Sequence, residues 1–163
     1  MNAKTIIVAG SETTSTLLTG AVFLLNMHPR VLEKLTQEVR SSFSNDKEIS
    51  LLSVGKLHYM LACINESLRR YPPVGTGMPR EVPKGGAKVA GHFIPEGTVT
   101  AVWQWAINHD PRNFKKPMEF HPERFLGDPV FEGDKLDAMQ PFSVGPRNCI
   151  GKKYVCQKSL SRL

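Results

Sequence analysis

The most constraining feature of this 163-residue chain is one cysteine held in a short glycine-flanked loop near its C-terminal end. The segment reads FSVGPRNCIG and fills the pattern F-x-x-G-x-R-x-C-x-G through Phe142, Gly145, Arg147, Cys149 and Gly151. An ordinary cysteine in a glycine-rich turn is the alternative. At average residue usage, however, five fixed positions match by chance in well under ~1 in 1,000 short chains. The pattern therefore indicates a loop built around this cysteine.

This pattern resembles the heme-binding loop of the cytochrome P-450 family of monooxygenases, and the resemblance implies a role for each fixed residue. Cys149 is expected to be the axial thiolate ligand of heme iron, since a thiolate donates electron density that favours O–O cleavage. Inward-pointing N–H groups and a nearby positive charge favour its deprotonation. Gly145 and Gly151 let the backbone turn tightly and approach the porphyrin, and Phe142 opens the loop. Arg147 is expected to pair with a heme propionate.

Two further segments carry the same resemblance. Glu66 and Arg69 stand at positions i and i+3 of a predicted helix and share one face, although such pairs are commonplace on solvated helices. The segment Pro122–Phe125 reads PERF. In the family, an arginine from such a segment joins a Glu-x-x-Arg pair. The resemblance therefore implies a buried charge triad of Glu66, Arg69 and Arg124 with a structural role.

The N-terminal segment resembles the family's distal helix, which lies beside the oxygen-binding site. Gly10 would let this helix approach heme and O2 closely. Glu12 would act as a relay acid and Thr13 as a hydrogen-bonding partner in proton delivery. The alternative is a helix with a polar kink, since serine and threonine hydroxyls can bond back to helical carbonyls.

Other candidate residues are assigned singly. The family resemblance implies that Arg80 binds a second heme propionate; the alternative is a solvated arginine at the start of a strand. Cys63 and Cys156 are expected to be structural, and the five histidines, none with a zinc-like spacing to a cysteine, to be structural or surface residues. The sequence GTG at residues 75–77 lacks the third glycine of a dinucleotide-binding turn. NADPH is therefore expected to bind a partner rather than this chain.

The resemblance implies a mainly α fold with a small β region, namely the C-terminal part of the P-450 fold as an incomplete domain over residues 1–163. Hydrophobic periodicity and proline breaks predict helices at 5–27, 30–43 and 53–70, the last as one helix or two. Short β-prone runs predict strands at 87–90, 92–94 and 98–103. A helical turn at 105–108, a long ordered loop at 111–141 and a helix from residue 152 complete the prediction.

Composition is that of a globular protein, with 40% hydrophobic and 22% charged residues. The net charge of +6 is spread along the chain, which favours an acidic protein partner over nucleic acid. Three cysteines at no framework spacing argue against a disulfide-stapled secreted protein. The apolar stretch 17–27 is too short to cross a bilayer. No transmembrane segment is therefore expected in this chain, and membrane contact is expected only through a part that precedes it.

The resemblance covers residues 1–151 and looks closest to fungal microsomal members. It implies a heme-dependent monooxygenase that inserts one atom of O2 into a small organic substrate at the cytosolic face of the endoplasmic reticulum. Electrons are expected from NADPH through a flavoprotein reductase, with Lys115, Lys116, Lys152 and Lys153 in the docking surface. Two alternatives stay open: a truncated, catalytically inactive fragment, and a heme-binding or sensing module without oxygenation. Glu12 and Thr13 favour the enzyme, whereas the absence of the family's N-terminal half favours the fragment.

Overall fold

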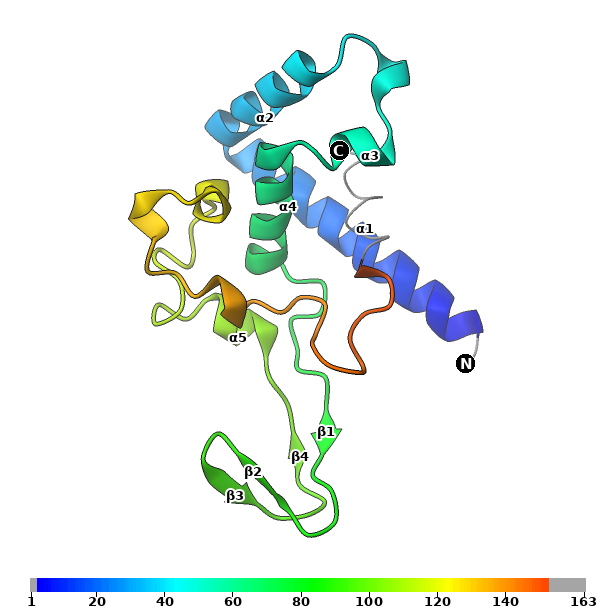
Figure 1. Cartoon of the computed structure of the whole chain (residues 1–163), viewed down its shortest axis with the longest axis vertical. Coiled ribbons are helices and arrows are strands. Elements are labelled where there is room, and N and C mark those ends of the chain that lie inside the picture. Colours follow the sequence, from blue (N-terminus) through cyan, green and yellow to red (C-terminus); the bar gives the residue numbers. More distant parts are fainter. Residues whose placement is uncertain (1–2, 153–163) are drawn as a thin grey trace.

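The computed structural model describes residues 3–152 and consists of a helical body from which a small β region projects (Figure 1). The α-helices are α1 (Ala3–Met27), α2 (Pro29–Ser42), α3 (Leu51–Val54), α4 (His58–Arg70) and α5 (Gln104–Asn108). The 3-10 helices are η1 (Asp46–Glu48), η2 (Pro122–Leu126), η3 (Pro129–Phe131) and η4 (Leu136–Ala138). This mainly helical architecture with small sheets agrees with the predicted class.

The predicted segment 53–70 is divided into two helices, α3 and α4. Helix α3 begins at a capping box in which the Ser50 hydroxyl accepts the Ser53 N–H at 3.1 Å and the Ser53 hydroxyl accepts the Ser50 N–H at 2.8 Å. Helix α4 has Leu57 at its N-cap, which has no polar side chain to offer. The predicted loop at 111–141 contains the short 3-10 helices η2, η3 and η4. The helix expected from residue 152 lies almost entirely outside the described residues.

Helix α4 is the centre of the hydrophobic core. It contacts α1, α2, α5 and η2, and its buried side chains include Met60, Ile64 and Leu68. Leu17 and Leu24 of α1, together with partners from α2 and from the segment before η2, complete this cluster. The central position of α4 places the Glu-x-x-Arg pair inside the protein rather than on a solvated face.

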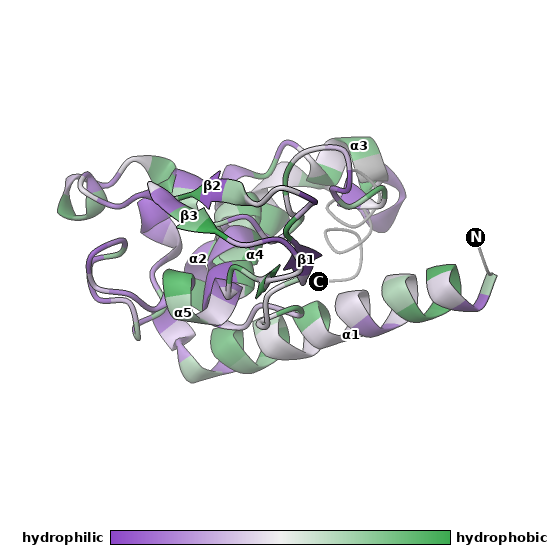
Figure 2. Ribbon diagram, turned by 90° about the horizontal axis from the view of Figure 1, so that it is seen from below, coloured by the Kyte–Doolittle hydropathy of each residue, from purple (hydrophilic) through white to green (hydrophobic). Residues whose placement is uncertain are grey.

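Helix α1 is buried only along its C-terminal half, from Leu17 to Leu25, and its N-terminal half projects beyond the body (Figure 2). The prediction of no membrane-spanning segment, which measured only residues 17–27, was too strict. Within the described residues, α1 as a whole is long and apolar enough to cross a membrane. Length and composition are weak evidence here, because the C-terminal half of α1 packs against α2 and α4 as a core helix does.

The β region consists of two antiparallel pairs. Strand β1 (Arg80–Glu81) pairs with β4 (Val99–Thr100), and β2 (Ala87–Val89) pairs with β3 (His92–Ile94). Residues Ala90 and Gly91 join β2 to β3 with φ angles of 49° and 87°, as in the hairpin turns whose twist matches that of the strands. The short strand β1 was not predicted, because two residues give no alternation to recognise.

Candidate functional site

The loop that carries Cys149 is closed by its own backbone. The Cys149 N–H donates to the Phe142 carbonyl at 2.8 Å, and the Asn148 N–H donates to the Gly145 carbonyl at 3.0 Å. Gly145 has φ +81°, a left-handed conformation that favours glycine. The Cys149 side chain is exposed. The loop therefore presents a thiol outward from a hydrogen-bonded frame, as a ligand loop must.

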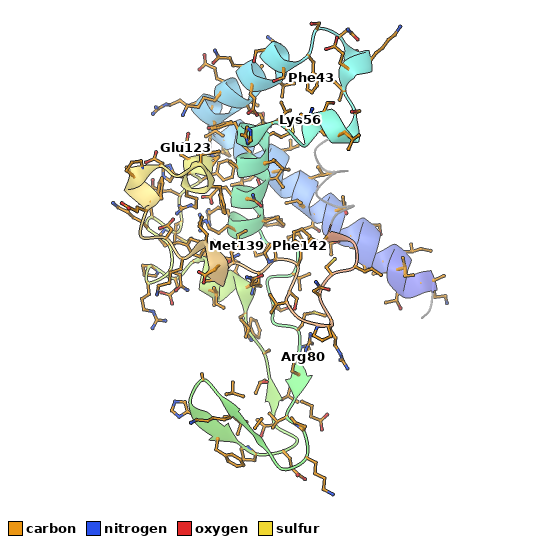
Figure 3. The ribbon with its side chains drawn as sticks, in the orientation of Figure 1. Phe43, Lys56, Arg80, Glu123, Met139 and Phe142 are labelled. Carbon is orange, nitrogen blue, oxygen red and sulfur yellow. The ribbon has the colours of Figure 1, made fainter. Side chains whose placement is uncertain are left out.

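The start of this loop is anchored in the body of the protein. Phe142 and Met139 are half-buried and pack against the hydrophobic core beside α4, as Figure 3 shows with both side chains labelled. The Gln140 N–H donates to Gln104 Oε1 of α5 at 3.0 Å. The Lys152 ammonium lies 5.9 Å from the centre of the Phe142 ring. The phenylalanine of the motif thus links the loop to the core, whereas Gly151, at the other end, is half-buried.

Two further candidate residues, both arginines, are exposed. Arg147 lies in the cysteine loop, and Arg80 lies in β1, where its Nη1 donates to the Pro79 carbonyl at 2.9 Å (Figure 3). An exposed thiol is a suitable donor to heme iron, and guanidinium groups suit the carboxylates of the porphyrin. The donor set of Cys149, Arg147 and Arg80 therefore fits a heme.

The polar patch of α1 is arranged differently from a fully formed proton relay. Thr13 is half-buried and its Oγ1 donates to the Ala9 carbonyl at 2.6 Å. The hydroxyls of Ser11 and Thr14 bond back to the helix in the same way, as the alternative interpretation of this segment predicted. Glu12 is exposed. Within residues 3–152, no hydrogen bond joins this patch to the cysteine loop. The space beside Gly10 is open, since a Cβ at this position would meet no atom within 4 Å.

The structure brings Glu66 and Arg69 together as a fully buried, two-pronged ion pair. Arg69 Nε lies 2.8 Å from Glu66 Oε2 and Arg69 Nη2 lies 2.8 Å from Glu66 Oε1, with both side chains at 0% exposure. The remaining Arg69 donors bond to the carbonyls of Asn108 and Pro117, each at 2.7 Å, and of Glu119 at 2.9 Å. One guanidinium therefore connects α4 to α5 and to the loop before η2.

Arg124 of η2 joins this pair, and a fourth residue joins Arg124. Its Nε lies 3.0 Å from Glu66 Oε2, but the N–H is not aligned for a hydrogen bond, so this contact is an ion pair only. Arg124 Nη1 forms an ion pair with Asp134, which is buried to the same degree. Sequence reasoning missed Asp134, because it stands in a loop that has no periodicity and belongs to no motif. The sequence offers no signal that would have found it.

A second buried contact adjoins this network. Arg70 Nη1 lies 2.6 Å from His109 Nε2, and His109 Nδ1 lies 2.7 Å from the Trp105 carbonyl. Since arginine only donates, His109 Nε2 accepts and Nδ1–H donates, which is the neutral imidazole. Burial is the main cause of the lowered pKa of His109, and the charge of Arg70 adds to it. This histidine is structural, in agreement with the prediction for all five.

Comparison with known proteins gives a consistent result. The family model described as Cytochrome P-450 matches residues 1–154. The cytochrome P-450 monooxygenase tpeC of Talaromyces stipitatus is 58% identical over 147 residues, which are 90% of this chain and 29% of that protein. Trichothecene C-15 hydroxylase of Fusarium sporotrichioides is 55% identical, over 92% of this chain and 31% of that protein. Averantin hydroxylase of Dothistroma septosporum is 52% identical, over 93% of this chain and 29% of that protein. The chain thus spans about a third of the length of these relatives.

Proposed function

The chain belongs to the cytochrome P-450 family, and from this premise we propose that it supplies the ligand loop and the distal helix of a heme-dependent monooxygenase. On this proposal it is the C-terminal part of the family's fold, with residues 1–163 forming a partial domain. The observation that supports it most directly is the hydrogen-bonded loop that carries the exposed Cys149 thiol and, two residues before it in the chain, the exposed Arg147.

Different residues of the chain would bind the iron and the propionates of the heme. Cys149 would ligate the iron as a thiolate, and Arg147 and Arg80 would pair with the two propionates, each as a charge-assisted hydrogen bond. When bound, heme supplies the chemistry that inserts one atom of O2 into an organic substrate while the other atom is reduced to water. The frame bond from the Cys149 N–H to the Phe142 carbonyl would hold the ligand in position.

Residues of helix α1 would take part in proton transfer. The Thr13 hydroxyl already donates to the Ala9 carbonyl, so it would act by accepting a hydrogen bond from water on its lone pairs. Glu12 is exposed on the same helix and would exchange protons with solvent as the relay acid. Gly10 would keep the backbone of this helix free of a Cβ on the side that faces the cofactor.

The substrate and the electron source are proposals from the family. The hydroxylase names of the relatives, for trichothecenes and averantin, support a small organic substrate of fungal secondary metabolism. Electrons would come from NADPH through a flavoprotein reductase, at the cytosolic face of the endoplasmic reticulum. Lys115, Lys116 and Lys152 are exposed and would contribute to the basic docking surface, whereas Lys153 lies outside the described residues. Unchanged reductase coupling after charge reversal at all four lysines would remove this part of the proposal.

A second candidate function is a chain that keeps these residues but does not oxygenate, either as an inactive chain or as a heme-sensing module. The exposed N-terminal half of α1 favours the inactive chain, since Ile6, Ile7 and Val8 are 57%, 67% and 59% exposed. A heme pocket with an open side excludes water poorly. The proton-handling residues Glu12 and Thr13 favour the monooxygenase over the sensor.

The test is the absorption spectrum of the reduced, CO-bound protein after the purified chain is mixed with heme. We expect a strongly red-shifted Soret band, which reports a thiolate ligand, and its loss in Cys149→Ala. Cys63→Ala serves as the matched control, because Cys63 is the buried free cysteine of α4. A normal spectrum in Cys149→Ala, or no band in the wild-type chain, would contradict the assignment of Cys149 in this chain.

A further inference from the structure

Asp134 is a buried acid that belongs to no motif of the sequence. Its side chain is 1% exposed. Both carboxylate oxygens are engaged: Oδ1 accepts the Lys115 N–H at 2.7 Å, and Oδ2 forms the ion pair with Arg124. A buried carboxylate is costly unless it is paired and hydrogen-bonded. The surroundings of Asp134 therefore stabilise an ionised carboxylate, which indicates a structural role for its charge.

The charge balance of the network shows what that role is. Glu66 commits both oxygens to Arg69, and its Oε1 also accepts the His121 N–H at 2.9 Å. Arg124 meets Glu66 only through a misaligned contact. Without Asp134, one carboxylate would face two buried guanidiniums. With it, two acids balance two bases, and Arg124 has a carboxylate that it does not share.

The position of Asp134 in the chain connects this network to the cysteine loop. The next residue, Lys135, donates its N–H to the Asn113 carbonyl at 2.8 Å. The segment then runs through η4 to Gln140, which is bonded to Gln104, and on to Phe142, whose carbonyl accepts the Cys149 N–H. Asp134 is thus the first in a series of fixed points along the segment that ends at the thiol.

We propose that Asp134 is a positioning residue for Cys149. By holding Arg124 and the backbone of Lys115, it fixes the point at which the segment 135–149 leaves the buried charge network. The thiol is thereby presented at a constant place in the fold. In so far as the thiol is the heme ligand, this inference rests on the proposed function, but the geometry of the segment can be tested without heme.

The first experiment is amide hydrogen exchange on the heme-free chain carrying Asp134→Asn. This change keeps the size of the side chain and removes its charge. We expect exchange of the hydrogen-bonded amides of residues 135–149 to accelerate by about tenfold or more, because Arg124 is left without its own carboxylate. Residues of α1 and α2 should keep their wild-type protection. Asp137→Asn, an exposed acid in the same segment, is the matched control and should change nothing. Uniform acceleration along the whole chain, or none, would overturn the proposal.

A double variant covers the case in which Asp134→Asn does not fold. In Arg124→Gln/Asp134→Asn neither member of the pair is charged, so no unpaired guanidinium is left at this position. We expect this chain to fold and still to exchange faster over residues 135–149. If it fails to fold as well, or keeps wild-type protection there, Asp134 has no specific effect on the cysteine segment and the proposal is wrong.

The second experiment measures the ligand directly. In heme-loaded samples of equal heme content, Asp134→Asn should lower the share of the red-shifted, thiolate-type Soret band, and Asp137→Asn should leave it unchanged. An unchanged share in Asp134→Asn would count against the proposal. If the wild-type chain gives no such band, the proposed heme function of this chain fails, whereas the exchange experiment still decides whether Asp134 positions the segment.

Discussion

At the residue scale, His109 is a buried titratable side chain with a defined protonation state. It accepts from Arg70, donates to the Trp105 carbonyl and stacks on the Trp105 ring with centroids 4.5 Å apart. Its pKa is lowered, mainly by burial and then by the charges of Arg70 and Arg69, despite opposing contributions from the Trp105 carbonyl and Glu66. Unfolding returns it to the ordinary value of about 6.5. Below that pH the imidazole of His109 is protonated in the unfolded chain but stays neutral in the folded chain until the pH reaches its lower folded pKa.

The stability of the folded chain should therefore fall as the pH decreases through about 6.5 toward the folded pKa, which is lower. His109→Gln keeps a group that can accept from Arg70 and donate to Trp105 but does not titrate. We expect urea unfolding between pH 7 and pH 5 to show a smaller loss of stability in His109→Gln than in the wild type. His92→Gln, an exposed histidine of β3, is the control. If His109→Gln loses as much stability between pH 7 and pH 5 as His92→Gln does, His109 is not the cause of this pH dependence.

Arg69 shows how much one side chain can connect. Its fork bonds to both oxygens of Glu66 and to three backbone carbonyls, one from α5 and two from the loop before η2. Arg69→Lys keeps the charge but cannot reproduce this planar pattern. A lysine ammonium has three donors for the five bonds of Arg69, so we expect the free energy of unfolding in urea to fall by about 3 kcal/mol or more, at about 1.5–3 kcal/mol for each lost bond to a charged group. Arg112→Lys, in an exposed pair with Asp110, should have no measurable effect. A small effect of Arg69→Lys would mean that charge alone holds the network.

At the element scale, the N-terminus of helix α4 is capped by Glu38, a side chain of α2. Leu57 cannot cap its first turn, and Glu38 accepts the N–H groups of Tyr59 at 2.8 Å and Met60 at 2.9 Å. Acceptors at a helix N-terminus stabilise it through the unpaired donors and the helix dipole. Glu38→Gln should therefore cost about 1 kcal/mol in urea unfolding. Glu33→Gln, an exposed acid of the same helix, should be neutral. Equal effects of the two would exclude capping.

The elements also show which parts of the fold the sequence could predict. The helices α1 and α2 were predicted because periodicity and the His28–Pro29 break are local signals. The association of Glu66, Arg69 and Arg124 was expected only through the family resemblance, since nothing local joins α4 to η2. The cap from Glu38 and the ion pair of Asp134 were not predicted. Both depend on how distant segments pack, and neither residue type is rare enough at its position to stand out.

At the scale of the whole molecule, burial is uneven. The C-terminal half of α1, α2 and α4 enclose the core, whereas the N-terminal half of α1 leaves Ile6, Ile7 and Val8 more than half exposed. On the cysteine loop, Ile150 is 96% exposed. Apolar surface of this extent is typical of a surface that contacts another polypeptide or a ligand. In isolation, the same surface should promote self-association.

This expectation can be tested by placing one charge on the projecting part of α1. Ile7 is 67% exposed, so Ile7→Lys removes apolar surface from water without opening a cavity, and lysine is a good helix former. Sedimentation velocity at increasing concentration should show less self-association in Ile7→Lys, with an unchanged urea midpoint. Lys4→Ala, in the first turn of the same helix, removes a charge and should leave self-association the same or increase it. Equal association of the wild type and Ile7→Lys would place the contact elsewhere. A lowered urea midpoint would instead show that the projecting half of α1 packs against the folded body in solution.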